Sequence, residues 1–285
     1  MLGAYYKHFL DSSVVRPMFH GAEVYKQYFK EHFRNDRLYI SSYVQMEFLR
    51  SFIVPILGFY FILDLPNVRT ISDALSVWSN RFKKTELKAL INLVSIIFQA
   101  HVLDFTNPKD KEKALRAIDR IIIRYYSKLK RSFLNIGDQG ARCERAKVAL
   151  RQKRGVNDKK IFEGFLDSFL NVTQCQSKCV IEHFLCKRYK SEVEKYIRHA
   201  QSLRNPNSTE NVGFFKISDK LNQILQKNTT ITCRVCEAIG DAIIALEMPQ
   251  NMLLEHTDYS FDHLCKLIDK SHNRHPSEIS VVKRQ

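Results

Sequence analysis

Residues 236–268 read CEAIGDAIIALEMPQNMLLEHTDYSFDHLCKLI, and this stretch decides the fold. Cys236–Glu247 has apolar residues at helical spacing, and Pro249 ends that helix. Asn251–Glu255 is short and apolar, which predicts a strand, and Phe261–Ile268 returns to helical spacing. The stretch therefore predicts a helix, a strand and a second helix in that order.

The N-terminal residues repeat this alternation. Ala4–Leu10 and Arg37–Ile40 are predicted strands, and a helix that reaches about Phe33 lies between them. Ser42, with Gln45 three residues later, has the form of a capping box, so a second helix should begin there. Alternating strands and helices are typical of a parallel sheet, so we expect an α/β fold with three layers.

The middle of the chain differs from both ends because it is rich in helical patterns and poor in strand patterns. We expect residues 71–227 to form a long α-helical insertion. Residues 1–70 and 228–272 would then be the two halves of one α/β domain. Residues 273–285 are predicted to be a flexible tail.

The charge of the chain points to an anionic partner. The 285 residues carry a formal net charge of +15, and residues 107–160 hold 17 Lys or Arg against 6 Asp or Glu. Tyr125, Tyr126 and Phe133 are interleaved with these cations, a combination that favours nucleic acid over a merely solvated helical face. A membrane surface that binds the basic segment is a weaker alternative.

No segment of the sequence predicts a membrane anchor or a secretory leader. The most apolar stretch, Phe52–Leu63, has twelve residues and contains Pro55 and Gly58, so it is too short to cross a bilayer core of about 30 Å. The N-terminus meets charges at Lys7 and Asp11, and the seven cysteines are an odd number. We therefore expect a cytoplasmic protein with reduced thiols and no membrane partner.

Carboxylates occupy the places where a parallel sheet binds ligands. Asp11 follows the first predicted strand and Asp258 follows the last, while Glu47 and Asp241 lie in early turns of helices. Taken singly, each acid is more simply a surface charge or a helix cap. If they converge at the carboxyl edge of the sheet, they require a cation, and Mg²⁺ or Mn²⁺ suits oxygen ligands.

Four local strings carry a resemblance to the PIN-domain nucleases: FLDSSVV, SSYVQMEFLR, IGDAIIALE and EHTDYSF. They occur in the family's order and cover roughly residues 4–60 and 230–270; the long insertion departs from that compact family. The resemblance implies that Asp11, Glu47, Asp241 and Asp258 bind the metal and are the catalytic acids. It also implies hydrolysis of phosphodiester bonds, with RNA as the favoured substrate.

Several residues near these acids have two alternative roles. Ser42 and Thr257 either position a water or a phosphate oxygen, or cap helices; Arg50 either contacts phosphate or pairs with Glu47. Asp262 could lie near the metals, but we interpret it as an acid of a helix surface. Three histidines lie near the predicted site: His8, His256 and His263. A neutral imidazole could bind a metal there, but we interpret these three as surface or packing residues.

The positions of the cysteines are compatible with a zinc site. Cys175 and Cys179 share a helical face with Cys186, and Cys233 and Cys236 form a CxxC. Zinc bound by Cys175, Cys179, Cys233 and Cys236 would join the insertion to the catalytic domain, but cysteine is also a common small core residue. Cys143 and Cys265 are interpreted as unpaired thiols.

The leading hypothesis is thus a metal-dependent nuclease of the PIN type. The alternative is a non-catalytic nucleic-acid-binding or scaffold protein that keeps the fold. A second copy of the chain and an inhibitory protein are the protein partners that fit such a nuclease. No residue distinguishes RNA from DNA, or a toxin from a defence or processing enzyme.

Overall fold

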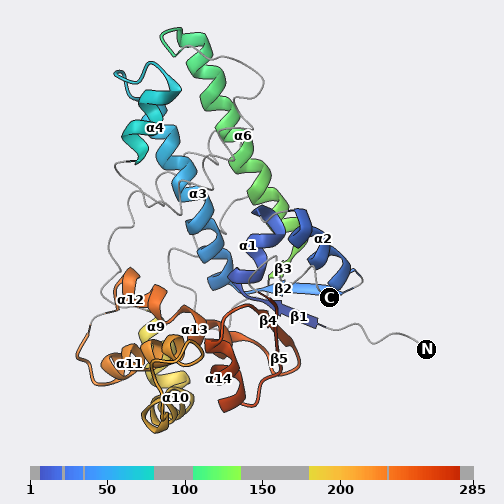
Figure 1. Ribbon diagram of the computed structural model, residues 1–285, viewed down its shortest axis with the longest axis vertical. Coiled ribbons are helices and arrows are strands. Elements are labelled where there is room, and N and C mark those ends of the chain that lie inside the picture. The colour runs from blue at the N-terminus through green and yellow to red at the C-terminus, as the bar shows by residue number, and fades with distance from the viewer. Residues whose placement is uncertain are drawn as a thin grey trace. The chain divides into compact units, whose positions relative to one another are not determined.

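The computed structural model describes residues 7–20, 23–34, 36–79, 105–135, 180–229 and 231–276. These residues form two compact units (Figure 1). Unit 1 contains the described residues up to Met46 and those from Phe133 onward, and unit 2 contains those within Glu47–Ser132. Residues 180–227 lie in unit 1 together with the sheet. The domain limits expected at residues 70 and 228 stay a prediction.

Unit 1 is built on a five-stranded parallel sheet. In order across the sheet the strands are β3 (Leu134–Asn135), β2 (Arg37–Ile40), β1 (Lys7–Leu10), β4 (Leu253–His256) and β5 (His272–Arg274). Every neighbouring pair is parallel. The chain builds outward from β1 to β2 and β3, and then returns to the other side of β1 with β4 and β5. The strand order therefore reverses between β1 and β4, which is where open parallel sheets bind ligands.

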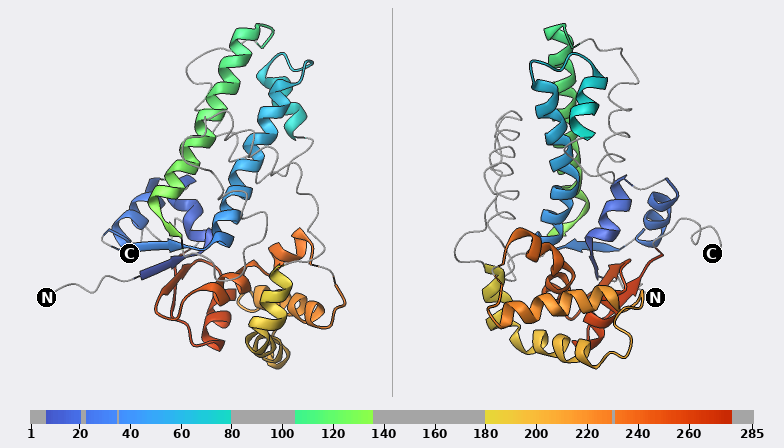
Figure 2. Two further views of the ribbon diagram at one scale, coloured as in Figure 1. Left: turned by 180° about the vertical axis from the view of Figure 1, so that it is seen from behind. Right: turned by 60° about the vertical axis from the view of Figure 1, so that its left-hand side comes forward.

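Helices flank this sheet. Figures 1 and 2 show α1 (Ser12–His20) and α2 (Glu23–His32) on one face, and α13 (Gly240–Glu247) and α14 (Ser260–Leu267) on the other. The remaining elements of unit 1 complete the side that carries α14: α9 (Val180–His183), the π-helix η1 (Phe184–Arg188), α10 (Lys190–Ser202), α11 (Val212–Leu225) and α12 (Cys233–Ala238). The chain is thus an α/β protein with a parallel sheet, as the sequence predicts.

The first strand and helix show why the sheet edge is polar. Phe9 and Leu10 are fully buried in β1, and the chain turns at once into α1. The Asp11 carbonyl accepts from the amides of Val14 and Val15, and its side chain accepts from Ser13. Asp11 therefore caps α1, and the cap holds its carboxylate at the carboxyl end of β1.

The helix α3 (Ser42–Asp64) begins where the sequence predicts, but its cap lies one residue earlier. The Ser41 hydroxyl accepts from the amide of Val44 at 3.0 Å, and the Ser41 carbonyl accepts from Gln45 at 3.0 Å. The predicted capping role of Ser42 is therefore wrong, and its side chain is available for another use.

The predicted helix Cys236–Glu247 is divided. Ile239 leaves helical geometry, with φ −111° and ψ 12°, and separates α12 from α13. Glycine follows at 240, so α13 starts afresh and Asp241 falls in its first turn. At the other end, the buried Lys270 ammonium donates to the carbonyls of Ala245 and Leu246 and satisfies two of the orphan acceptors there.

The predicted tail begins with ordered structure. His272–Arg274 form β5, which pairs with β4 from Leu254↔His272 to His256↔Arg274. His275 is 3% exposed, and its amide donates to the carbonyl of His256 at 2.7 Å. The tail prediction is therefore wrong for residues 273–276, while residues 277–285 lie outside the described part of the chain.

Unit 2 consists of helical segments around a separate apolar core. The α3 residues within it bury Ile56, Phe59, Ile62 and Leu63, so the apolar stretch 52–63 contributes to a protein core. Trp78 is fully buried in α4 (Ile71–Ser79). The long helix α6 (Pro108–Ser132) buries one stripe and exposes seven cations: Lys109, Lys113, Arg116, Arg120, Arg124, Lys128 and Arg131.

Within the described ranges, none of the helices combines the length and the apolar character needed to span a membrane.

Candidate metal centre

Three of the four predicted acids lie near enough to one another for their charges to interact, beside the point where the strand order reverses. Asp11 follows β1, Asp258 follows β4, and Asp241 lies in the first turn of α13, all within unit 1. The charge of Asp11 raises the pKa of both Asp241 and Asp258, and the charge of Asp258 raises that of Asp241. We call these residues the aspartate cluster.

Backbone contacts hold the two strand-end aspartates beside each other. The amide of Asp11 donates to the carbonyl of Glu255 at 3.0 Å, which extends the pairing of β1 with β4 to the edge. The amide of Thr257 donates to the hydroxyl of Ser13 at 3.1 Å, which joins the loop before Asp258 to the first turn of α1. Thr257 thus positions this loop through its backbone.

Asp11 is the most enclosed member, with only 2% of its surface exposed. Its carboxylate accepts from the amide of Ser13 at 2.8 Å. Burial raises its pKa, and the hydrogen bonds from Ser13 and Ser12, together with the charge of Arg16, only partly oppose this effect.

The pKa of Asp241 is strongly raised. Burial and then the charge of Asp11 raise its pKa to about 7, although its carboxylate accepts a hydrogen bond from the Ser260 hydroxyl. This carboxyl group therefore keeps its proton to a much higher pH than an ordinary aspartate. A bound cation would replace the proton and relieve the repulsion.

Asp258 is exposed, although its neighbours remove part of its hydration. This desolvation and the charge of Asp11 raise its pKa, whereas Arg16 lowers it. Arg16 projects from α1 one turn beyond Ser12, whose hydroxyl accepts from it at 3.4 Å. The guanidinium lowers the pKa of all three aspartates, so it is the positive charge of this edge.

Ser42 adds an unsatisfied oxygen at the same edge. It follows β2, whose register with β1 (Phe9↔Tyr39) brings the ends of both strands to one level. Ser42 is only 3% exposed, and no described group hydrogen-bonds its hydroxyl. Oxygen donors alone, most of them carboxylates, fit a hard cation such as Mg²⁺ or Mn²⁺.

The fourth predicted acid belongs to the other unit. Glu47 is half-buried on α3 and is counted with unit 2, so the cluster within unit 1 consists of the three aspartates. The side chain of Arg50 lies outside the described residues. The role predicted for Glu47 stays a prediction.

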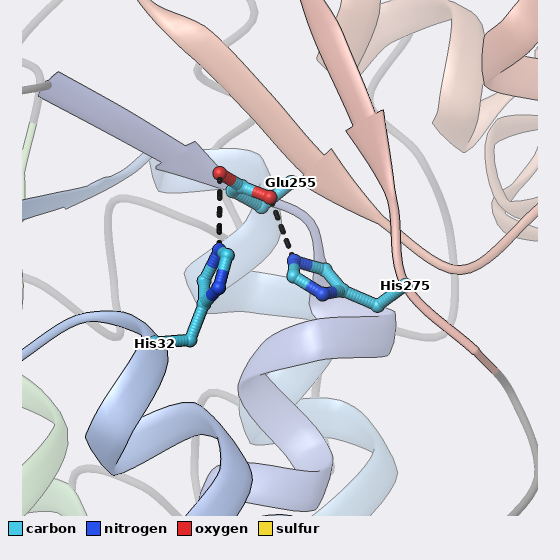
Figure 3. Close-up of side chains that lie close together, drawn as sticks. All are labelled: His32, Glu255 and His275. Atoms are coloured by element: carbon cyan, nitrogen blue, oxygen red, sulfur yellow. Dashed lines mark hydrogen bonds and ion pairs between the residues drawn. The ribbon is translucent and has the colours of Figure 1, made fainter. Parts of the chain in front are cut away.

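A second polar cluster lies on the sheet face that α2 covers (Figure 3). At its centre is Glu255 of β4, which is fully buried. Figure 3 shows the two oxygens of this carboxylate facing His32 of α2 on one side and His275, just beyond β5, on the other. His8 and Asn273 complete what we call the Glu255 cluster.

The Glu255 carboxylate uses nearly all of its capacity to accept hydrogen bonds. It lies 2.5 Å from His8 Nδ1, 2.6 Å from His275 Nε2 and 2.9 Å from Asn273 Nδ2. His275 also uses its second nitrogen, which lies 3.0 Å from the Tyr28 hydroxyl. Burial opposes ionisation, but these hydrogen bonds outweigh it and lower the pKa of Glu255 to about 2. We therefore interpret the Glu255 cluster as a structural network.

The three predicted surface or packing histidines have different environments. His8 contacts Glu255, His263 stacks on Phe214 with the ring centroids 4.9 Å apart, and His256 is fully buried. Burial and the neighbouring His272 lower the pKa of His256 to about 3, so its ring is neutral. Sequence reasoning missed Glu255, although an acid inside an apolar strand requires buried partners.

Most of the residues proposed to bind zinc lie outside the described part of the chain: Cys175, Cys179 and the side chain of Cys233. The Cys236 sulfur lies 3.7 Å from the hydroxyl of Tyr43, which donates at 2.7 Å to the Cys236 carbonyl. Cysteine-bound zinc stays a prediction.

Comparison of the chain with protein-family models, with curated proteins and with solved structures finds no match.

Proposed function

We propose that the protein is a divalent-metal-dependent nuclease, with a PIN-like fold, that hydrolyses phosphodiester bonds, and that RNA is its substrate. The observation that supports this proposal is the interaction between the charges of Asp11, Asp241 and Asp258 beside the point where the strand order reverses. Carboxylates that raise one another's pKa in a partly buried edge create a demand for positive charge.

The oxygen donors of this edge would hold Mg²⁺ or Mn²⁺, with Asp11 and Asp241 as the enclosed ligands and Asp258 on the solvent side. When bound, such an ion lowers the pKa of a coordinated water and neutralises charge on phosphate oxygens. Ser260 fixes the Asp241 carboxylate by donating to it. Arg16 is exposed beside the three acids, where its guanidinium could receive a phosphate oxygen of the substrate.

The basic character of the chain supports a polyanionic substrate. Seven exposed Lys and Arg residues lie along α6, and two of them, Lys113 and Arg116, form ion pairs with acids of the same helix, at 2.9 and 2.5 Å. Such a surface binds phosphate backbones without reading the sequence. It serves the alternative equally well, a non-catalytic nucleic-acid-binding or scaffold protein.

The experiment that separates these functions compares cleavage with binding. A labelled single-stranded RNA is incubated with the protein in Mg²⁺ or Mn²⁺ and in EDTA, and binding is followed by fluorescence anisotropy. The nuclease proposal expects metal-dependent cleavage that Asp241→Asn abolishes while RNA affinity is kept. Asp219→Asn, the same change at an exposed acid of α11, should leave cleavage intact.

Binding without cleavage in the wild-type protein would support the scaffold. Cleavage that survives in Asp241→Asn would show that the aspartate cluster is not the catalytic centre. A single-stranded DNA of the same sequence, tested in parallel, addresses the preference for RNA.

A further inference from the structure

Three potential metal ligands converge on the α14 side of the sheet, apart from both clusters described above. They are His256 at the end of β4, Asp262 in the first turn of α14, and His272 at the start of β5. His256 Nε2 lies 3.1 Å from His272 Nδ1. Asp262 Oδ1 lies 3.7 Å from the first of these nitrogens and 3.5 Å from the second.

These separations match the edges of a coordination tetrahedron. Zinc binds imidazole nitrogen and carboxylate oxygen at about 2.0–2.2 Å, so adjacent ligands of a tetrahedral zinc ion are roughly 3.3–3.5 Å apart. The three measured distances fall around this value without any movement of the side chains. One dication could therefore contact all three atoms.

The surroundings leave the ligand atoms oriented for an ion. Arg274 contacts the other oxygen of Asp262, Oδ2, at 3.0 Å, and its guanidinium lies over the ring of Tyr259, 3.8 Å from the centroid. This arrangement fixes the carboxylate with Oδ1 turned to the histidines, as outer partners of metal ligands commonly do. His256 Nε2 and His272 Nδ1 are hydrogen-bonded to each other, and a bound ion would replace this contact.

The site is also open to ions and water on one side. His256 is fully buried, whereas the side chains of Asp262 and His272 are 33% and 27% exposed. Three protein ligands leave the fourth tetrahedral position for a water molecule. The ligands come from β4, α14 and the edge strand β5, so one ion would join three elements that the chain connects only through loops.

We propose that His256, Asp262 and His272 bind a transition-metal dication of the zinc type. Imidazole ligands favour zinc over the hard cations that suit the aspartate cluster, so the two sites should be loaded by different metals. The proposal is independent of the nuclease function.

The test uses Co²⁺ as a spectroscopic substitute for zinc on the metal-free full-length protein, with excess Mg²⁺ present to occupy the aspartate cluster. Tetrahedral binding should give visible Co²⁺ bands that saturate at one equivalent and disappear when Zn²⁺ is added. Thiolate ligands would add an intense charge-transfer band in the near ultraviolet. Its absence is expected here, because this set contains no cysteine.

Substitutions in each candidate set of ligands show which set binds the ion. His272→Gln and Asp262→Asn should each weaken Zn²⁺ binding by at least about 100-fold, because loss of an outer partner alone costs about 10–100-fold. His32→Gln is the matched control for His272→Gln, since its side chain is 34% exposed and it belongs to the Glu255 cluster. Cys236→Ser tests the cysteine set.

Melting curves in EDTA establish that each variant folds like the wild type, so that lost binding reports a lost ligand. The proposal is overturned if the wild-type protein gives no saturating tetrahedral spectrum. It is equally overturned if His32→Gln or Cys236→Ser, rather than His272→Gln, removes the ion.

Discussion

Glu255 Oε2 and His275 Nε2 lie 2.6 Å apart in the interior of unit 1, where the two side chains are 0% and 1% exposed. The contact joins the middle of the sheet to the segment just beyond its edge strand. It also shows that a carboxylate can be kept charged in the core when several donors surround it.

Replacing this carboxylate should therefore be costly. Glu255→Gln places an amide NH₂ against donors from His8, His275 or Asn273, and we expect it to lower the free energy of unfolding by about 3–5 kcal/mol. Urea unfolding near neutral pH measures this loss. Glu31→Gln, at an exposed position of α2, should change stability by less than about 0.5 kcal/mol. Equal stability of the two variants would contradict the network.

The same network predicts an acid-dependent stability. The pKa of Glu255 is about 2 in the folded protein and 4.5 ordinarily, so its contribution is complete above pH 4.5 and is lost as the pH falls toward 2. The difference in unfolding free energy between wild type and Glu255→Gln should therefore narrow below pH 4.5. Urea midpoints of both proteins at several pH values measure it, and a constant difference would refute the assignment.

Asp241 should affect the pH dependence of stability in the opposite direction. Its pKa rises from 3.8 to about 7 on folding, so folding favours its protonated form and loses stability as the pH rises from 3.8 through 7. Asp241→Asn carries no charge, so at pH values above 7 it should be more stable than the wild type, by about 1–3 kcal/mol. Below about pH 3.8 this difference should vanish. A variant that is less stable than wild type in alkali would argue against the repulsion.

A bound cation should remove the loss of stability that the ionised Asp241 carboxylate causes. Above pH 7, Mg²⁺ or Mn²⁺ should raise the melting temperature of the wild-type protein, because the ion binds only the folded aspartate cluster. Asp241→Asn should show a much smaller rise. Differential scanning fluorimetry with and without metal measures both, and Asp219→Asn should respond like the wild type.

The exposed face of α6 should control binding of nucleic acid. Reversing two of its charges, in Arg120→Glu with Arg124→Glu, should weaken binding of single-stranded RNA. It should also reduce the slope of log affinity against log salt by about 1.4, since each lost phosphate contact contributes about 0.7. Lys195→Glu with Lys216→Glu carries the same charge change on exposed sites of α10 and α11. If both pairs weaken binding equally, net charge and not α6 is responsible.

The sequence predicted elements with strong local patterns. Arg37–Ile40 forms the predicted strand, and Ser260–Leu267 agrees with the predicted helix within one residue. The parallel strands β1 and β4 bring Asp11 and Asp258 to the same edge of the sheet, where the charges of both interact with Asp241. Their role as metal ligands stays a prediction.

Long-range pairing decided what the sequence could not show. His272–Arg274 contains no apolar residue, so nothing local marks it as a strand; its pairing with β4 makes it one. No local sequence pattern marks Arg16 as part of a site, and only the fold brings its charge to the three acids. The partners of Glu255 come from three different elements or their ends, which no spacing in the sequence reveals.

Both margins of the sheet in unit 1 end in very short strands, β3 with two residues and β5 with three. Beyond β5 the chain reaches Pro276, which has no amide hydrogen to offer a neighbour. Among the described residues, another molecule that met either edge would find only a short strand to pair with. The folded unit should thus resist edge-to-edge aggregation, even at the high concentrations at which polybasic proteins gather on RNA.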